Sequence, residues 1–382
     1  MLPEGWKRVP LHKIADVRTG LAKGRQGLKD VLELPYLRVA NVQDGHIDLR
    51  EVKTIQVGRA DIDRYALLAG DVLMTEGGDF DKLGRGAVWC GEIAPCLHQN
   101  HVFAVRPNAD YLDSSFLSAL SGSEYGRNYF LSCAKRSTNL ASINSSQLKT
   151  FPVLLPRLDE QKRISEVLAI WDAAIATTDN FLANSRRQKQ ILAIRLLRAK
   201  AHWVNSVFGE VFEISNQKAA QVAANAYQVR GSVPIVDQGK QFITGYTDDD
   251  SVVVEPPIIV FGDHTRVVKW VDFRFRPGAD GTQLLQPKAD IYPKFAYHLL
   301  ANAPIQNLGY SRHMSILKTL DFPIPPDQAE QSSIADRLDL ADQVIAAIEL
   351  QIEKLKTEKR ALMQQLLTGK RRVHLPIGKV SA

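Results

Sequence analysis

The sequence predicts an α+β protein in which two globular domains alternate with two long helices that pair as an antiparallel coiled coil. Three observations predict this fold: a short motif that occurs twice, a heptad pattern of apolar residues after each copy, and strand-like segments before each copy. The 382 residues are too many for one ordinary core, and 45% of them are hydrophobic, which indicates a folded protein. We therefore expect a pseudo-two-fold internal repeat within one chain.

The repeated motif is a proline-rich segment that runs into a Glu-Gln pair. The first copy is Phe151–Pro156, followed by Glu160-Gln161, and the second is Phe322–Pro326, followed by Glu330-Gln331. Because the residue before a proline disfavours helix, each segment predicts the start of a helix immediately afterwards. Asp327 and Glu330 also have the spacing of a capping pair at the second start.

Apolar residues recur after each Glu-Gln pair at alternating steps of four and three, which is the pattern of a coiled-coil seam. A helix of about 40 residues would be roughly 60 Å long and needs a partner along its length. The other helix is the obvious partner. Lys189 and Lys359 hold equivalent seam positions, where they either fix the register or cover the seam with their aliphatic stems. The main expected seam residues are Ile164, Leu168, Trp171, Ile175, Leu182, Ile334, Leu338, Ile345, Ile352 and Leu355.

The first globule carries short apolar runs separated by turn signals. We expect strands at Leu34–Val39, Asp71–Thr75, Gly86–Trp89 and His101–Val105, and a helix at Ser114–Leu131. Such a mixture predicts a compact α+β or mostly β domain. The loops between these segments are polar, basic and rich in glycine: 18–27, 77–85 and 135–139.

The second globule follows the same plan in a shorter form. Arg85–Trp89 (RGAVW) has a counterpart in Arg266–Trp270 (RVVKW), and Leu148–Thr150 has one in Leu317–Thr319. Elsewhere the two globules diverge. Similar helices with dissimilar globules are expected if the helices serve a common partner while the globules recognise different things. The expected domains are globules at 1–156 and 201–326, helices at 157–200 and 327–372, and a tail at 373–382.

The bulk composition is compatible with several classes of partner. A net charge of +6, from 48 basic and 42 acidic residues, suits a polyanion but does not demand one. Cys90, Cys96 and Cys133 form no regular set, which favours a reducing cytoplasm over a disulfide framework. The most apolar stretch, Val252–Phe261, is interrupted by Glu255 and two prolines, so no membrane span is expected.

Common catalytic motifs are incomplete in this sequence. Glu255–Ile258 (EPPI) lacks the flanking acid or amide and the aromatic residue that a base-flipping methyltransferase needs. Thr368–Arg371 (TGKR) lacks the earlier glycine and the hydroxyl of a phosphate-binding loop. We therefore expect a chain that neither methylates nor hydrolyses ATP by itself.

Two polar clusters are candidates for chemical sites. Cys90, Cys96, His98 and His101 match no standard zinc spacing, and His98–Val105 has the alternation of a strand, so no metal is expected. Asp263–Arg266 (DHTR) has no nucleophile spaced to pair with His264. That segment is either a loop that hydrogen-bonds a nucleic acid or a structural turn.

Basic residues gather at the carboxyl ends of both predicted helices. They either compensate the helix dipole and keep the ends solvated, or bind phosphate or an acidic partner. These residues are Arg186, Arg187, Arg195, Arg198, Lys200, Lys370, Arg371 and Arg372.

Taken in order, these motifs resemble type I restriction-modification DNA specificity subunits over residues 5–372. The resemblance rests on the duplicated helices with their Glu-Gln starts and on the closing segment Gln364–Arg371 (QQLLTGKR). Three further segments also match: Tyr36–Asn41 (YLRVAN), Gly70–Thr75 (GDVLMT), and Phe261–Arg266 (FGDHTR) together with Gly278–Gly281 (GADG). The second globule departs from the family pattern by being shorter.

The resemblance implies a division of labour among subunits. Each globule would be a target-recognition domain that reads one half of a split double-stranded DNA site, and the helices would act as spacer and docking surface. Two methyltransferase subunits would supply adenine methylation from S-adenosylmethionine, and a motor-nuclease subunit would cleave DNA with ATP and Mg. The chain itself would be non-catalytic, would bind no cofactor, and would work in the cytoplasm.

For such a role, Lys and Arg would contact phosphates while a few loop side chains read base edges. The expected DNA-binding residues are Lys82, Arg85, Lys135, Arg136 and Asn139 in the first globule, and Arg230, His264, Arg266, Arg312 and His313 in the second.

Three other functions compete with this one. A self-sufficient DNA-binding regulator would bind specific DNA tightly without partners. A coiled-coil scaffold for proteins would bind DNA weakly, and the basic loops argue mildly against it. A catalytic methyltransferase is disfavoured by the missing motifs.

Overall fold

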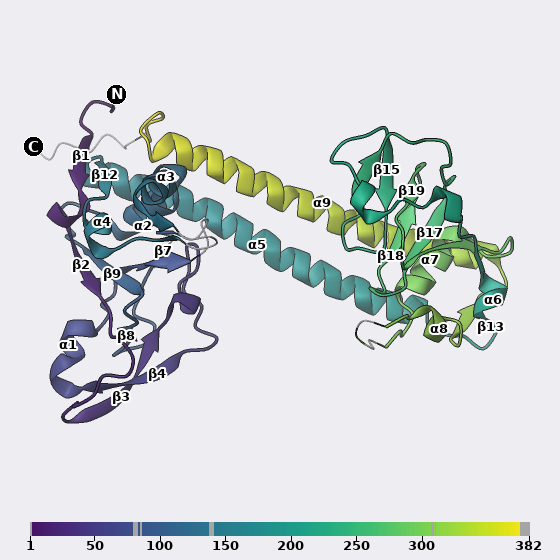
Figure 1. Ribbon diagram of the computed structural model, residues 1–382, viewed down its shortest axis with the longest axis horizontal. Coiled ribbons are helices and arrows are strands. Elements are labelled where there is room, and N and C mark those ends of the chain that lie inside the picture. Colours follow the sequence, from purple (N-terminus) through teal and green to yellow (C-terminus); the bar gives the residue numbers. More distant parts are fainter. Residues whose placement is uncertain are drawn as a thin grey trace, which may run out of the picture. The chain divides into compact units, whose positions relative to one another are not determined.

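The computed structural model describes residues 2–78, 83, 84, 86–136, 141–306, 309 and 311–374. It divides into two compact units (Figure 1). Unit 1 comprises Met1–Thr178 and Gln351–Ala382, and unit 2 comprises Asp179–Leu350. The long helices α5 (Leu158–Leu196) and α9 (Gln328–Leu366) are divided between the units, so each unit holds one globule and part of both helices.

The core of unit 1 is the four-stranded sheet β2-β9-β5-β7. Its central strand β5 (Val72–Thr75) is buried at every position, and α2 (Ser114–Gly122) and α3 (Glu124–Cys133) complete the core beside it. Three smaller sheets surround it, with strand orders β4-β3-β8, β10-β11-β6 and β1-β12. The other elements are β1 (Lys7–Pro10), η1 (Leu11–Lys13), β2 (Ala15–Thr19), β3 (Val31–Leu37), β4 (Lys53–Gly58), α1 (Ile62–Tyr65), β6 (Gly77–Gly78), β7 (Gly86–Val88), β8 (Leu97–His98), β9 (Val102–Pro107), β10 (Lys135–Arg136), β11 (Ala141–Ser142), α4 (Ser145–Lys149) and β12 (Pro152–Leu155).

Two local predictions for this globule are corrected by the structure. The single helix expected at Ser114–Leu131 breaks at Ser123, whose hydroxyl accepts from Gly126 N and so caps a second helix. The alternating strand expected from His98 begins only at Val102, and its first four residues are all buried because the sheet is covered on both faces. The four predicted strands correspond to β3, β5, β7 and β9 with shifted ends.

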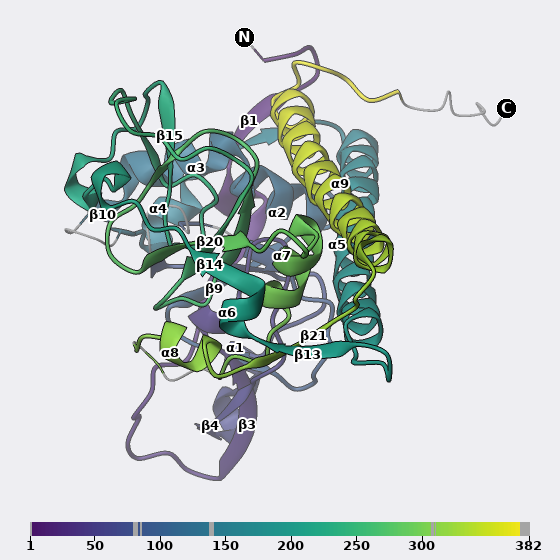
Figure 2. The same ribbon diagram turned by 90° about the vertical axis from the view of Figure 1, so that its right-hand side faces the viewer.

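Unit 2 repeats this plan with fewer strands. Its core sheet is β14-β20-β17-β18, and its central strand β17 (Ile258–Gly262) is buried throughout. The sheet β16-β15-β19 lies beside it, and β13 pairs with β21 as Figure 2 shows. The other bounds are β13 (Val204–Val207), α6 (Phe208–Val211), β14 (Phe212–Ile214), β15 (Val233–Val236), β16 (Gly245–Thr247), β18 (Val268–Val271), β19 (Arg276–Pro277), β20 (Thr282–Pro287), α7 (Pro293–Ala301), α8 (Met314–Leu317) and β21 (Asp321–Ile324).

The long helices run antiparallel within each unit, as the heptad pattern predicts. In unit 1, Lys359 of α9 pairs with Asp172 of α5, and in unit 2, Lys189 of α5 pairs with Asp342 of α9. The interval between the two lysines equals the interval between the two aspartates, and it is also the interval between the two Glu-Gln pairs. Both seam lysines therefore have a fixed carboxylate partner on the opposite helix, which favours the register interpretation over simple covering of the seam.

The predicted seam residues are all buried or half-buried. Ile164 and Leu338 are the most enclosed, at 1% and 0% exposure, because each also joins the core of its own globule. The seam is thus continuous with the globular core, and the expected coiled-coil pairing is confirmed.

The glutamine of each Glu-Gln pair fixes the start of its helix to the globule. The side-chain oxygen of Gln161 accepts from Asp113 N before α2 at 2.9 Å, and that of Gln331 accepts from Tyr292 N before α7 at 2.6 Å. Each side-chain nitrogen donates to the proline carbonyl that precedes its own helix, at Pro156 and Pro325.

The glutamate of each pair accepts a hydrogen bond from a tryptophan and forms an ion pair with a cation, both from outside its own helix. Glu160 accepts from Trp6 Nε1 and pairs with Arg372, while Glu330 accepts from Trp203 Nε1 and pairs with Lys200. These two ion pairs involve Lys200 and Arg372, two of the cations that gather at the carboxyl ends of the helices. They also overturn the expected capping pair, because Glu330 is occupied by Lys200, His202 and Trp203 while Asp327 caps Ala329 N by itself.

Candidate nucleic-acid interface

Two of the predicted residues of the first globule, Lys135 and Arg136, lie in the small sheet β10-β11-β6. Lys135 is exposed and forms β10 with Arg136, and β10 pairs with β11, which in turn pairs with β6. Lys82 and Arg85 follow β6 in the chain and Asn139 follows β10; these three residues lie outside the described residues. The strand pairing therefore brings together the two places in the chain from which these loops start.

In the second globule, the turn after β17 is held by Asp263. The carbonyl of Asp263 accepts from both N and Nδ1 of His313 at 2.8 Å, and its carboxylate accepts from Met314 N at 2.7 Å. His313 is fully buried, at 0% exposure. Its observed role is to join this turn to the start of α8, and its side chain does not reach the surface.

The other predicted residues of this globule are placed differently from one another. Arg266 has a left-handed φ of +61° and donates from Nη1 to Ile305 O at 3.0 Å, so the arginine supports the turn. His264 is half-buried, and Arg312 is exposed beside the buried His313. Arg230 is also exposed but precedes β15, whereas the turn contacts the opposite end of that strand.

Sequence reasoning missed Gln238, the residue that ties this turn to the neighbouring sheet. Its side-chain oxygen accepts from His264 N, its carbonyl accepts from Thr265 Oγ1, and its side-chain nitrogen donates to Asp280 O. Gly281 makes room for it, since a Cβ there would lie 2.5 Å from Gln238 Nε2. The GADG motif was the available signal, because its glycines mark a close approach by another segment.

Both globules therefore carry loops that are held on a similar framework of sheets. The chain matches a family model described as the type I restriction modification DNA specificity domain, over residues 3–183 and 200–357. The chain belongs to this family. In this family the specificity subunit supplies DNA recognition and is not catalytic, so the fold, the DNA-recognition role and the non-enzymatic role expected from the sequence are confirmed.

Individual relatives agree with the family assignment. A putative type I restriction enzyme MjaX specificity subunit from Methanocaldococcus jannaschii is 26% identical, over 97% of this chain and 95% of its own length. The type I restriction enzyme EcoKI specificity subunit of Escherichia coli K12 is 25% identical over 44% of this chain and 38% of its own length.

Solved structures show the same fold. The crystal structure of a type I restriction-modification system S subunit from M. genitalium aligns with a TM-score of 0.57, 14% identity and 97% of both chains. A structure from work on complex assembly and conformational transition of the type I R-M system gives a TM-score of 0.59 and 16% identity, covering 97% of this chain and all of that one.

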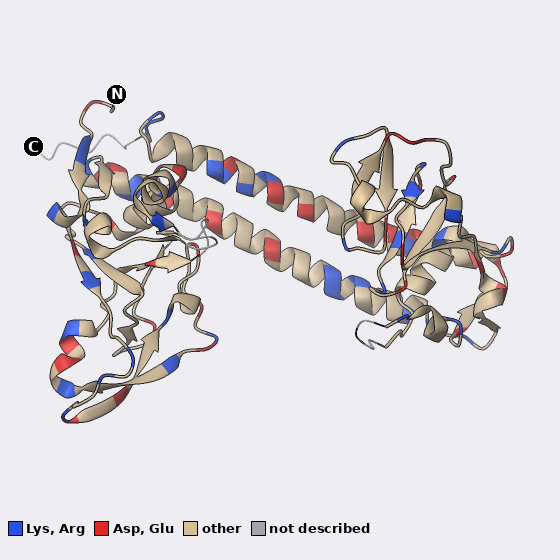
Figure 3. Ribbon diagram, viewed as in Figure 1, with Lys and Arg blue, Asp and Glu red and all other residues tan. Residues whose placement is uncertain are grey.

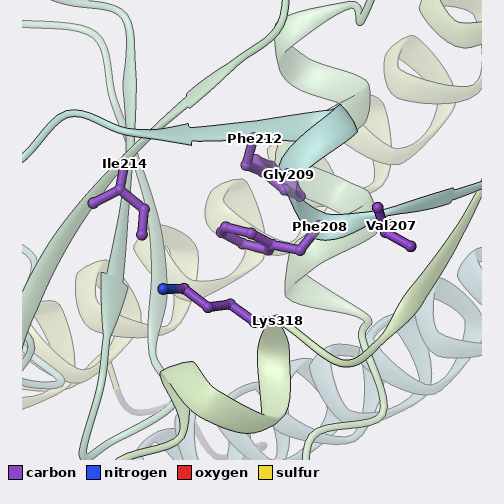
Figure 4. Close-up of a pocket in the computed structure, with 6 residues that line it drawn as sticks. All are labelled: Val207, Phe208, Gly209, Phe212, Ile214 and Lys318. Carbon is purple, nitrogen blue, oxygen red and sulfur yellow. The ribbon is translucent and has the colours of Figure 1, made fainter.

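Two other features of unit 2 could be mistaken for reaction centres. An open pocket is lined by Val207, Phe208, Gly209, Phe212, Ile214 and Lys318 (Figure 4). Its apolar lining and single lysine provide no paired acid, base or nucleophile.

The second feature is a charged cluster at the α7 side of the long helices. His298, Asp339 and Asp342 lie close enough together to resemble a metal site. However, Asp339 also faces Lys294 at 3.5 Å, and Asp342 pairs with Lys189. Burial lowers the pKa of His298, whose Nε2 lies 2.7 Å from Asp339. The lysines already balance both carboxylates, so the cluster joins α7 to the helices.

Proposed function

We propose that this chain directs partner enzymes to a two-part DNA sequence, with each globule reading one half. The observation that carries the proposal is that a single chain of a DNA specificity family contains the same globule plan twice, each time built on a four-stranded sheet with a three-stranded sheet beside it. Two globules with dissimilar loops suit two dissimilar half-sites. Because both must reach one DNA molecule, we expect the half-sites to lie about one helical turn, ~34 Å, apart or to be brought together by bending.

The proposed contacts divide into two kinds. Exposed cations position each globule on phosphates with a salt-dependent affinity, and nearby polar side chains read base edges. Lys82, Arg85, Lys135, Arg136 and Asn139 would serve the first globule, and Arg230, His264 and Arg312 the second. Arg266 and His313 would act by holding the turn in place, because their observed bonds are to backbone atoms of the chain itself.

We propose further that two methyltransferase subunits dock on the long helices. Ile170 on α5 and Leu340 on α9 are 68% and 61% exposed. They hold matching positions in the two copies of the repeat, so equivalent apolar side chains stand on both helices. Figure 3 shows basic and acidic residues interspersed along the rest of both helices. Two equivalent surfaces suit two copies of one partner.

The chemistry would reside in those partners. The methyltransferase subunits would use S-adenosylmethionine to methylate adenine, and a motor-nuclease subunit would use ATP and Mg to cleave unmodified DNA. Among the described residues, no helix combines the length and apolarity needed to cross a membrane. We propose that the complex works in the cytoplasm, where such cofactors and DNA meet.

The test is co-expression of this chain with its methyltransferase subunit, followed by mapping of N6-methyladenine on the host DNA by sequencing. Methylation at a single split motif, absent when this chain is omitted, is the expected result. Formation of the complex without motif-dependent methylation would reject the proposal. Tight specific binding by the chain alone would instead favour a self-sufficient regulator.

A further inference from the structure

A feature shared by both globules is a long hairpin loop that none of the sequence motifs identified as a DNA contact. In unit 1 it is 38–52, which joins β3 to β4, and in unit 2 it is 237–244, which joins β15 to β16. The two loops occupy the same place, because β3 and β15 are each the middle strand of a three-stranded sheet, antiparallel to the next strand in the chain and parallel to the third. We propose that these hairpin loops read bases of the two half-sites, an inference that rests on the proposed function.

The loop of unit 2 is held by a buried lysine of strand β18. Lys269, only 4% exposed, donates from Nζ to the carbonyls of Asp237 and Gln241 at 2.7 and 2.6 Å. The carboxylate of Asp237 accepts from Gly239 N and Thr244 Oγ1, which closes the loop on itself. Burying an ammonium group is costly unless it is well bonded, so this loop is held in a defined shape at both of its ends.

The loop of unit 1 is fixed by an amide in the same way. Asn41, only 3% exposed, donates from Nδ2 to the carbonyls of Asp48 and Glu51 at 2.8 and 2.9 Å. Its side-chain oxygen accepts from Arg38 N at 2.9 Å. Both globules therefore use one buried side chain to bond two carbonyls of the hairpin loop, although the side chain comes from the loop in one case and from a core strand in the other.

Each anchored loop presents polar and cationic side chains to solvent. Lys240 and Gln241 are exposed in unit 2, beside Phe242, which is 46% exposed and contacts Phe273 edge-on. In unit 1, His46 is exposed, and the side chain of Arg50 is 90% exposed while its guanidinium pairs with Asp48 of the same loop. Arg and Lys pair with guanine edges and Gln with adenine, so these side chains are of the types that read bases in the major groove.

In unit 2 the hairpin loop also borders the turn already proposed as a DNA contact, and in unit 1 it borders the start of β7. In unit 1, Gly45 N donates to the carbonyl of Gly86, the first residue of β7. By sequence, Gly86 corresponds to the residue that follows Arg266 in unit 2. In unit 2, the bonds of Gln238 with His264 and Thr265 join the loop to the turn. In unit 2 the hairpin loop and the turn after β17 thus form one continuous edge, and in unit 1 the hairpin loop reaches the start of β7. The buried Asn41 and Lys269 are positioning residues for the two loops.

The inference is tested with the chain in its complex with the methyltransferase subunit. The double variant Lys240→Ala/Gln241→Ala is expected to relax base preference at one or two positions of one half-site by about 10- to 100-fold. Arg50→Ala is expected to relax the other half-site and leave the first unchanged. The readout is the methylated motif, position by position, on host DNA.

Matched controls distinguish reading from general damage. Lys318→Ala and Lys149→Ala remove exposed lysines at equivalent places in the two globules, away from the loops, and are expected to leave both half-sites intact. Lys269→Met keeps the length of the side chain but removes both hydrogen bonds. It should relax base preference in the same half-site as Lys240→Ala/Gln241→Ala. Thermal melting shows whether a variant is folded, and the single variant Lys240→Ala replaces the double one if that fails to fold.

The outcomes separate the inference from the function on which it rests. If the unaltered chain directs methylation to a split motif and folded loop variants leave both halves unchanged, the loops do not read DNA and the proposed function stands. Relaxation of both half-sites by one loop variant would also reject the inference, since each loop would then act on the whole complex. Absence of any motif with the unaltered chain would reject both.

Discussion

The helix starts and the hairpin loops differ in how closely the two units repeat each other. At the helix starts the same residue types make the same bonds twice: Gln161 and Gln331 hold the globule, and Glu160 and Glu330 receive a tryptophan and a cation. At the hairpin loops the anchoring geometry recurs, but an asparagine in one unit is replaced by a lysine from another strand in the other. The helix starts keep their residues in both units, whereas the hairpin loops, proposed to meet different DNA sequences, keep only their anchoring by one buried side chain.

The largest effect is expected from substitutions that create a cavity at equivalent seam positions of the two units. Leu168→Ala and Leu338→Ala each remove a leucine, 4% and 0% exposed, where the seam meets the globular core. Each is expected to lower the free energy of unfolding by about 2–5 kcal/mol, through lost burial and the cavity left behind. Urea unfolding measures both, and a small loss at only one position would show that the two seams are not equivalent.

Removing the glutamines tests the helix starts with a smaller expected effect. Gln161→Ala and Gln331→Ala each leave a backbone N–H before α2 or α7 and a proline carbonyl without their partners. The cost of burying such groups unpaired is about 1–3 kcal/mol each. Gln351→Ala, at an exposed position of α9, is the control and should change stability by less than about 0.5 kcal/mol. Equal losses at Gln161 and Gln331 would support the equivalence of the two starts.

The helices were predictable from the sequence because their information is periodic and repeated. The constant interval between the two motif copies and the heptad steps locate α5, α9 and their seam without knowledge of the globules. Pairing was expected because each helix needs a partner along its length, and the Lys189 and Lys359 ion pairs bear out the antiparallel direction that was also expected. What the pattern could not supply was the identity of the carboxylate opposite each lysine.

The candidate interface was only partly predictable, because its contacts join residues that are distant in the chain. Gln238 bonds to His264 and Asp280, 26 and 42 residues away. The glutamine itself, in a polar loop, gives no sign of this, and only the glycines of the distant GADG segment do. His313 lies in a loop of polar composition yet is buried, because Asp263 accepts from its ring and its backbone. Local composition marks loops, whereas burial within them depends on the fold.

The seam ion pairs offer a subtler test of equivalence. Lys189 with Asp342 and Lys359 with Asp172 are partly exposed, with the lysine side chains 24% and 22% exposed. Double-mutant cycles with Lys→Met and Asp→Asn are expected to give coupling energies of about 0.2–1 kcal/mol in each pair. Chemical denaturation at low and high salt measures them. A coupling in one pair and none in the other would break the symmetry inferred for the register.

The smallest expected effect concerns the ionisation of Glu330 at the start of α9. Hydrogen bonds from Lys200, His202 and Trp203 hold the pKa of Glu330 at about 2, below its ordinary value of 4.5. A lowered pKa stabilises the folded chain above about pH 4.5, and this contribution is lost as the pH falls toward 2. Because Glu330 is partly exposed, solvent screening should limit the effect to about 1 kcal/mol or less.

The variant Glu330→Gln isolates this contribution, since the amide keeps an acceptor for Trp203 but cannot titrate. At pH 7 it should unfold at lower urea concentration than the unaltered chain, and the difference should shrink as the pH falls from 4.5 to 2. A difference independent of pH would mean that Glu330 acts through shape and hydrogen bonding alone. The pairing of Glu330 with Lys200 would then be a consequence of the helix start rather than one of the interactions that secure it.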